Sequence, residues 1–215
     1  MKKHTEHQEP LVSIITPLYN ASAYIEQTIK SVQAQRYTNW EHLIVDDGST
    51  DTSYAQVAEL AKEDARIQLM ALPKNKGAAH SRNIATEKAK GSYIAFLDAD
   101  DLWHPEKLEK QVRLMRQHNV LVSHTSYVHI DQEGHLLGKR VRAIASLTYK
   151  KQHTNNYVGN LTGIYNAEKL GKIAAPTIRK RQDWALWLEA LRRAKQPAIG
   201  LQQDLASEES PFAAP

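Results

Sequence analysis

The segment Tyr93–Asp101, with the sequence YIAFLDADD, constrains the fold of this chain more than any other. Its first five residues are mostly apolar and rich in β-formers, which predicts a strand buried on both faces at the centre of a parallel sheet. The strand ends in three carboxylates, Asp98, Asp100 and Asp101. Ligands of open α/β sheets bind beyond the carboxyl ends of the strands. These acids are therefore candidate ligand-binding residues.

The spacing of the acids suggests a metal site. Asp98 and Asp100 are two positions apart, so both can face one bound object while Ala99 faces away. Carboxylates this close repel each other unless a cation lies between them, and ligands that are all oxygen suit Mg²⁺ or Mn²⁺. Such an ion keeps coordination positions for a diphosphate. The alternative interpretation is a turn, or a cap for the helix that starts near Pro105.

Strand and helix patterns alternate along the first hundred residues. This alternation predicts an α/β fold with a mostly parallel central sheet and helices on both faces. The loops after the strands should meet at one edge of the sheet and carry the functional residues. The predicted strands are Val12–Thr16, Glu41–Val45, Arg66–Leu72 and Tyr93–Leu97; the helices are 21–35, a segment with Val57, Leu60 and Ala61, and 78–88; the loops are 17–20, 46–51, 75–83 and 98–101.

The rest of the chain contains two strongly periodic helices separated by weaker patterns. We expect a single domain over residues 11–206, a flexible N-terminus at 1–10 and a tail at 207–215. The predicted elements are a helix from Pro105 with Leu108, Val112 and Met115 buried, a strand at 120–130 that returns as a hairpin through 135–137, a loop lining a substrate cleft at 138–156, a strand at 157–165, a helix at 182–194 and a strand near 199–205.

Composition limits the class of protein. The 215 residues include no cysteine, which excludes disulfides and thiolate metal sites. The apolar run at 11–15 is far too short for a signal peptide or a membrane span, so we expect a cytoplasmic protein. Residues 101–215 hold 17 Lys and Arg against 11 Asp and Glu. This basic half would suit peripheral association with the inner face of the membrane, or a solvated surface. We do not expect nucleic acid as a partner.

Several common sites are excluded by their motifs. The chain has no Gly-x-Gly-x-x-Gly, so a dinucleotide-binding site is not expected, and the run Gly134–Lys139 is one residue too short for a P-loop. No Gly-x-Ser-x-Gly elbow is present. His124 and His129 are an odd number of positions apart on a predicted strand and face opposite sides. Neither a serine triad nor a histidine metal site is predicted.

Five motifs in order resemble those of family 2 glycosyltransferases, which are inverting enzymes with the GT-A fold. The resemblance spans residues 11–204 and is nearest to bacterial enzymes of surface-polysaccharide synthesis, including the teichuronic acid type. It implies a nucleotide-sugar-binding half at 11–103 and an acceptor half at 104–206. The motifs are PLYN at 17–20, DDGSTD at 46–51, NKG at 75–77 with AHSRN at 79–83, GSYIAFLDADD at 91–101 and QDWALWL at 182–188.

The resemblance also implies a role for each motif residue. The donor would be a nucleotide sugar, most simply a UDP-sugar, the acceptor a glycan or lipid-linked saccharide, and the cofactor Mn²⁺ or Mg²⁺. Asp183 would be the general base. Pro17 and Tyr19 would hold the base of the nucleotide, and Asp47 would accept the uracil N3–H with Asp46 supporting its loop. Arg82 would lie near the nucleotide or diphosphate, and Asp98 would approach the ribose, with Ala99 also in the nucleotide-sugar site. Asp100, with Asp98, would bind the metal.

Two departures from the family pattern leave alternatives open. Gln182 stands where the family has glutamate before the presumed base. The segment Ser207–Pro211 stands where relatives have a Tyr-Arg-containing stretch. A nucleotide-sugar-binding protein with little transferase activity is therefore the alternative function. A nucleotidyltransferase would share the architecture, but the chain lacks the Gly-rich, basic N-terminal loop that this class uses.

Overall fold

The computed structural model describes residues 9–131, 134–178 and 180–209. The first hundred residues alternate strand and helix as predicted, and all four predicted strands are present. Strand ends differ from the prediction by one or two residues. The strands are β1 Val12–Leu18, β2 Trp40–Asp46, β3 Ile67–Ala71 and β4 Tyr93–Phe96, and the helices are α1 Ile25–Gln33, α2 Ser53–Glu63 and α3 Ala78–Lys88.

The remaining elements complete the sheet and add a second group of helices. Both long helices predicted for this part are present. The strands are β5 Leu102–Trp103, β6 Val122–Ile130, β7 Leu136–Val141, β8 Ser146–Leu147, β9 Ile164–Asn166 and β10 Ala198–Glu209; the helices are α4 Lys107–Gln117, α5 Tyr149–Gln152, the 3-10 turn η1 Asn160–Thr162, α6 Ala167–Leu170 and α7 Gln182–Ala194. Among the described helices, none has the length and apolar character needed to cross a bilayer.

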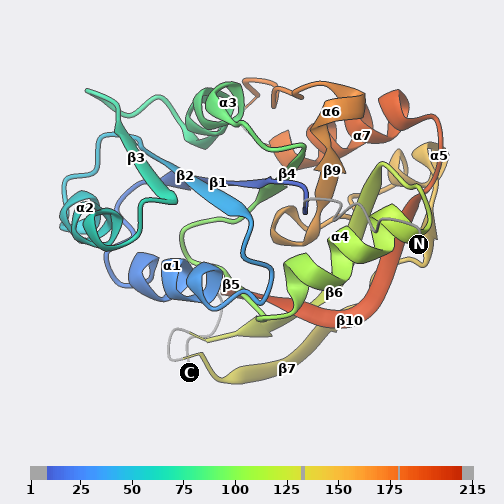
Figure 1. Ribbon diagram of the computed structural model, residues 1–215, viewed down its shortest axis with the longest axis horizontal. Coiled ribbons are helices and arrows are strands. Elements are labelled where there is room, and N and C mark those ends of the chain that lie inside the picture. The colour runs from blue at the N-terminus through green and yellow to red at the C-terminus, as the bar shows by residue number, and fades with distance from the viewer. Residues whose placement is uncertain (1–8, 132–133, 179, 210–215) are drawn as a thin grey trace, which may run out of the picture.

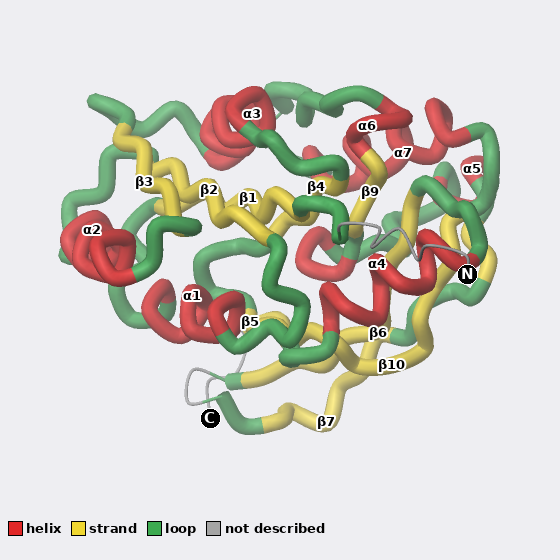
Figure 2. The backbone as a smooth tube through the Cα atoms, viewed as in Figure 1, coloured by secondary structure: helices red, strands yellow, loops and turns green. Residues whose placement is uncertain are grey.

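One sheet runs through the molecule in the order β3-β2-β1-β4-β9-β6-β10-β5. Its first four strands are parallel, and the strands beyond β4 are mixed because β9 pairs antiparallel with both β4 and β6. Figure 1 shows α1, α2 and α4 on one face and α3, α6 and α7 on the other, and the tube in Figure 2 follows the same layers. The predicted α/β fold with helices on both faces is confirmed.

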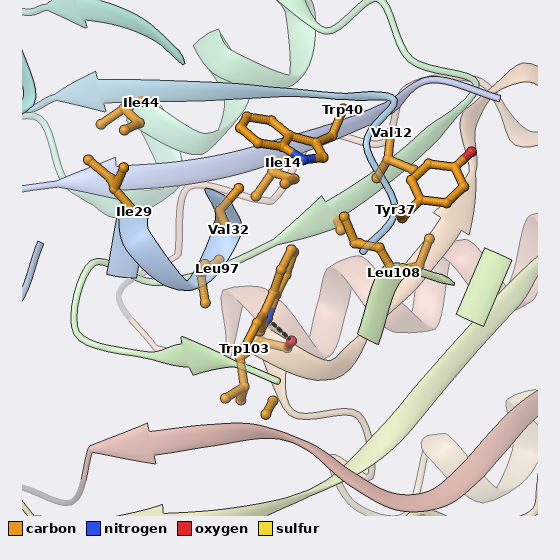
Figure 3. Close-up of a cluster of buried hydrophobic side chains, with 14 of the residues drawn as sticks. Val12, Ile14, Ile29, Val32, Tyr37, Trp40, Ile44, Leu97, Trp103 and Leu108 are labelled. Carbon is orange, nitrogen blue, oxygen red and sulfur yellow. Dashed lines mark hydrogen bonds between the residues drawn. The ribbon is translucent and has the colours of Figure 1, made fainter. Parts of the chain in front are cut away.

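Each face of the sheet carries its own hydrophobic core. β4 contributes to both, because Tyr93 and Ala95 belong to one cluster while Ile94 and Phe96 belong to the other, and Leu97, directly after the strand, joins the first. The predicted strand buried on both faces is thus confirmed. Figure 3 shows the first cluster, in which Trp103 donates its ring N–H to the carbonyl of Leu161 in η1 (2.8 Å). That bond ties η1 to the core.

The first strand was predicted to stop at Thr16, before Pro17, and this end point is wrong. β1 continues to Leu18, and Pro17 lies opposite Val45 in the parallel ladder with β2. The ladder between β1 and β4 ends at Ile15, whose carbonyl accepts from Leu97. The nitrogen of Pro17 faces this side, beyond the last paired residue, so its missing N–H leaves no ladder bond unmade.

The segment 138–165 differs most from its prediction. Residues 138–156 are not a loop, since they contain the end of β7, all of β8 and α5. Residues 157–165 are not one strand, because Thr162 bonds back to the carbonyl of Gly159 through both its N–H (2.9 Å) and its hydroxyl (2.7 Å), which closes η1. The predicted tail was also wrong in part: residues 207–209 belong to β10. Residues 1–8 and 210–215 lie outside the described part of the chain.

The largest of the buried side chains that pack α7 against the sheet is Trp187. Trp187 packs edge-on against Phe96 of β4 (ring centroids 5.8 Å apart) and against Tyr165 of β9 (6.4 Å). Its ring fills the space above Gly163, where a Cβ atom would lie 2.2 Å from two ring carbons. Only a residue without a side chain leaves room for the indole at this position.

We predict that Gly163→Ala lowers the free energy of unfolding by about 1–3 kcal/mol, because the added methyl overpacks the tryptophan slot. Urea denaturation measures the loss. The matched test places the same change in a Trp187→Leu background. There the alanine methyl has space, so the loss in free energy of unfolding should be clearly smaller. Equal costs in both backgrounds would show that the contact with Trp187 is not the cause.

Candidate active site

The carboxyl ends of β1, β2 and β4 open onto a small cleft of about 330 Å³. Its walls come from segments far apart in the sequence, which meet because the strands before them are parallel neighbours. Of the nine residues that the family resemblance singled out, seven line this cleft: Pro17, Tyr19, Asp47, Arg82, Asp98, Ala99 and Asp100. Tyr19 is about half exposed there, with 48% of its surface accessible.

Asp47 is held in one orientation by the loop opposite. Its Oδ1 accepts the backbone N–H of Lys76 (2.8 Å), and its Oδ2 accepts that of Gly77 (2.7 Å). The two loops approach closely because Gly48 has φ +76° and a Cβ there would lie 3.1 Å from the backbone of Asn75. Each carboxylate oxygen has a second lone pair, so Asp47 can still accept an N–H from a bound ligand.

Asp46, the neighbour of Asp47, does not line this cleft. It is buried, and its Oδ2 accepts the N–H of Ser49 at 3.2 Å. Its carbonyl accepts the N–H of Leu72 at 2.8 Å. Asp46 thus bonds to the loop that follows it and to the end of β3, which are the contacts expected of a residue that supports the site from outside.

Arg82 of α3 and Asp98 after β4 form an ion pair at the floor of the cleft. The Nη2–Oδ1 distance is 2.5 Å, and the Arg82 side chain is only 13% exposed. Burial alone would lower the pKa of Arg82, but the carboxylates of Asp98, Asp183 and Asp101 raise it above its usual value. Asn160 of η1 adds hydrogen bonds from Nδ2 to both oxygens of Asp98 (3.3 and 3.4 Å).

A second, larger cleft of about 800 Å³ adjoins the first. The two hollows share Gly77, Ala78, Arg82 and Asp98 as lining residues, so they form one continuous depression. Asp183, the predicted general base, lines the larger cleft. Asp98 lines the same cleft, so the start of the helix that carries Asp183 lies at the same edge of the sheet as Asp98.

Asp183 occupies the first turn of α7, where the positive end of the helix dipole favours a carboxylate. Trp187, one turn further along, anchors the helix to β4, whose last residue is Phe96. Asp183 Oδ2 accepts the side-chain N–H of Asn156 at 2.7 Å. The side chain is half-buried and remains accessible from the cleft.

The acids after β4 fit a divalent ion only as a partial site. Asp98 and Asp100 line the same cleft and offer oxygen ligands, which suit Mg²⁺ or Mn²⁺. Among the described residues no group of three or more acidic or histidine side chains converges on one point. Asp98 is also engaged by Arg82. An ion here would therefore complete its coordination with ligand oxygens and water, as Mg²⁺ does when it is bound with phosphates.

The structure brings four further residues into the larger cleft that the motifs did not reveal. Asn156 and Asn160 contact Asp183 and Asp98, and Tyr127 and Glu208 line the wall beyond. Burial raises the pKa of Glu208, the negative charges of Asp98 and Asp100 add to that rise, and a hydrogen bond from Tyr127 opposes it. Burial also raises the pKa of Tyr127. Glu208 falls in the segment that the sequence had assigned to a tail.

The family model for glycosyl transferase family 2 matches residues 13–175 of this chain. Two relatives match along most of its length. The putative teichuronic acid biosynthesis glycosyltransferase TuaG of Bacillus subtilis is 44% identical over 198 residues, covering 92% of this chain and 78% of TuaG. The Escherichia coli protein WfgD, named as a UDP-Glc:alpha-D-GlcNAc-diphosphoundecaprenol beta-1,3-glucosyltransferase, is 40% identical over 189 residues, covering 88% and 73%. The chain belongs to glycosyl transferase family 2.

Solved structures share the same fold at lower identity. S. aureus TarS 1-349 in complex with UDP has a TM-score of 0.77 at 23% identity and covers 93% of this chain. The mannosyltransferase PcManGT from Pyrobaculum calidifontis, in complex with GDP-Man and Mn²⁺, has a TM-score of 0.74 at 23% identity and covers 97%. This chain spans 60% and 59% of those two chains. The predicted GT-A fold is confirmed.

We predict that Arg82→Met lowers the free energy of unfolding by about 1–3 kcal/mol, because it leaves the half-buried carboxylate of Asp98 without its counter-charge. Urea denaturation measures the loss, and the double variant with Asp98→Asn should recover part of it. Arg140→Met, which breaks an exposed pair with Asp204, is the control and should cost less. A loss from Arg82→Met no larger than the control's would contradict the prediction.

Proposed function

We propose that this chain is a metal-dependent, inverting glycosyltransferase that uses a UDP-sugar to extend a glycan or lipid-linked acceptor in surface-polysaccharide synthesis. One observation carries the proposal: Asp183 and the Arg82–Asp98 pair line a single depression whose far end holds Tyr19 and Asp47. A donor can then occupy the small cleft while its anomeric carbon faces the larger one. The family and the names of TuaG and WfgD support the same activity.

The small cleft has the groups that a nucleotide requires. Tyr19 offers a half-exposed ring for stacking on a base, and Asp47 offers carboxylate oxygens already fixed by backbone N–H groups. A carboxylate in that orientation accepts the N3–H of uracil without reorganisation. TarS structures with UDP and with UDP-GlcNAc share this fold, which is consistent with a uridine nucleotide as the donor's leaving group.

The diphosphate would lie between the two clefts. Arg82 provides a fixed positive charge there, and Asp100, with Asp98, would hold the divalent ion. When bound, the ion would stabilise the negative charge that grows on the departing diphosphate. The Mn²⁺ in the PcManGT structure supports a divalent ion in this fold in general.

Asp183 would remove the proton from the acceptor hydroxyl. The hydroxyl oxygen then forms a bond to the anomeric carbon as the bond from that carbon to the diphosphate breaks, and the electron pair leaves with the diphosphate. Attack from the face opposite the leaving group inverts the configuration. Asp183 and Asp98 reach the larger cleft from different elements, the first turn of α7 and the loop after β4.

The acceptor would occupy the larger cleft. Its lining includes Lys76, His80, Lys180 and Arg181 on the side of α3 and α7. These basic side chains would suit an acceptor that carries phosphate, such as the diphosphate-linked saccharide in the name of WfgD. We propose peripheral association with the inner membrane face, where such a lipid-linked acceptor would be presented.

We predict that Asp183→Asn lowers kcat for sugar transfer by ~10² to 10⁴, because the amide cannot take up the acceptor proton. UDP binding, measured by calorimetry, should stay within about twofold of the original chain, since Asp183 lies outside the small cleft. Full transfer by this variant would refute the proposed mechanism. Tight UDP binding without transfer by the original chain would favour a nucleotide-sugar-binding protein instead.

We predict that Mn²⁺ strengthens UDP binding by about tenfold or more, because Asp100 would hold the ion and the ion would offset the negative charge of the diphosphate. Calorimetry with Mn²⁺ and with a chelator measures the difference. Asp100→Asn should remove most of this enhancement, whereas Asp64→Asn, at the amino end of β3, should preserve it. Equal UDP affinity with and without the metal would argue against a metal-bridged donor.

A further inference from the structure

Asp183 is connected to a chain of two side-chain amides that begins at a backbone N–H. Gln152, at the end of α5, is fully buried. Its Oε1 accepts the N–H of Tyr157 (3.1 Å), and its Nε2 donates to Asn156 Oδ1 (3.0 Å). Asn156 Nδ2 in turn donates to Asp183 Oδ2 (2.7 Å). All three links have normal hydrogen-bond lengths.

The direction of every bond in this chain is fixed by its first member. A backbone N–H can only donate, so the atom of Gln152 that faces Tyr157 must be the oxygen. The other end of the Gln152 amide is then its NH₂ group, which requires the oxygen of Asn156 to face it. The NH₂ group of Asn156 must therefore point at Asp183. Neither amide can flip without losing two bonds.

A further bond anchors the chain to the helix that carries the base. The ring Nε1–H of Trp184 donates to the carbonyl of Gln152 at 2.7 Å. Trp184 and Asp183 are adjacent at the start of α7. The segment from α5 to Asn156 thus contacts this helix through both the indole and the carboxylate, so its position and that of Asp183 are coupled.

We propose that Gln152 and Asn156 are positioning residues that keep Asp183 Oδ2 in a hydrogen bond with the amide of Asn156. The proton of the attacking hydroxyl is then taken up by the other oxygen, Oδ1. This inference rests on the proposed function. In the transfer step the O–H bond of the acceptor breaks and an Oδ1–H bond forms on Asp183, while the acceptor oxygen bonds to the anomeric carbon and the diphosphate leaves with the electron pair. The amides carry no charge and exchange no proton.

The charged and titratable groups near Asp183 do not take over the role of the two amides in orienting its carboxylate. Arg82 of α3 and Tyr127 of β6 both interact electrostatically with Asp183, and Arg181 lies before it with its guanidinium over the Trp184 ring (5.0 Å). The guanidinium of Arg82 is directed at Asp98. The hydrogen bond to Asp183 Oδ2 comes from the uncharged amide of Asn156.

Asn156→Ala tests the proposal without a change of charge. We expect kcat for transfer to fall about 10- to 100-fold, because the base loses its fixed orientation, with the KM for donor and the affinity for UDP within about twofold. With the Oδ2 partner gone, either oxygen can hold a proton, so the acid limb of the pH profile of kcat should move to higher pH. Asn166→Ala, which removes a hydrogen bond near the amino end of β4, should change neither value.

A second variant tests the chain rather than the single contact. Gln152→Met keeps the bulk of the side chain but removes both hydrogen bonds of its amide. It should therefore also lower kcat. The double variant with Asn156→Ala should lose little more than Asn156→Ala alone, because both act through one path. Thermal unfolding of each variant shows whether it is folded before kinetics are compared.

The outcomes separate this proposal from the one on which it rests. If Asn156→Ala keeps the original kcat and pH profile while Asp183→Asn abolishes transfer, the positioning chain is refuted and the proposed base stands. If Asp183→Asn itself transfers sugar normally, the proposed function fails first. If the two amide variants lower kcat by independent factors that multiply, the residues do not act as one chain, and the proposal is overturned.

Discussion

The packing of Trp187 against Gly163, Phe96 and Tyr165 sets the geometry on which the rest of the site depends. Trp187 lies one turn after Asp183, and Phe96 lies two residues before Asp98. The contact between the two rings therefore sets the position of the predicted base relative to the acids after β4. Because indole and phenyl rings are rigid, this packing holds α7 in a single position.

The electrostatics of the site follow from bringing so many acids to one edge. Asp98, Asp100, Asp101, Asp183 and Glu208 come from three different elements, and the buried charge of Arg82 is paired with Asp98. The pKa of Glu208 is raised by its burial first, and the negative charges of Asp98 and Asp100 add to that rise. A divalent cation would relieve that repulsion, and the bound diphosphate would in turn need the cation. Donor and metal would thus stabilise each other's binding.

Local sequence patterns predicted those parts of the fold that local physics determines. The apolar periodicity of α1, α4 and α7 and the runs of β1 to β4 located these elements to within a few residues. The end of the first strand was predicted too early, because whether a proline breaks a strand depends on where the ladder to β4 ends. Residues 138–165 were predicted poorly because their short elements form only by pairing with β6, β10 and α7. Asn156 and Asn160 could not be found, since an amide that bonds a distant carboxylate has no signature in its own segment.

The two clefts are lined by different parts of the sequence. The small cleft is lined entirely by residues between Pro17 and Asp100, whereas most of the wall that belongs to the larger cleft alone lies between Tyr127 and Glu208. Arg82 and Asp98 belong to both. With the donor in the small cleft and the acceptor in the larger one, as proposed above, substitutions in the later segment would change the acceptor while leaving the donor the same. Such a division would let related chains build different polysaccharides on one donor-binding half.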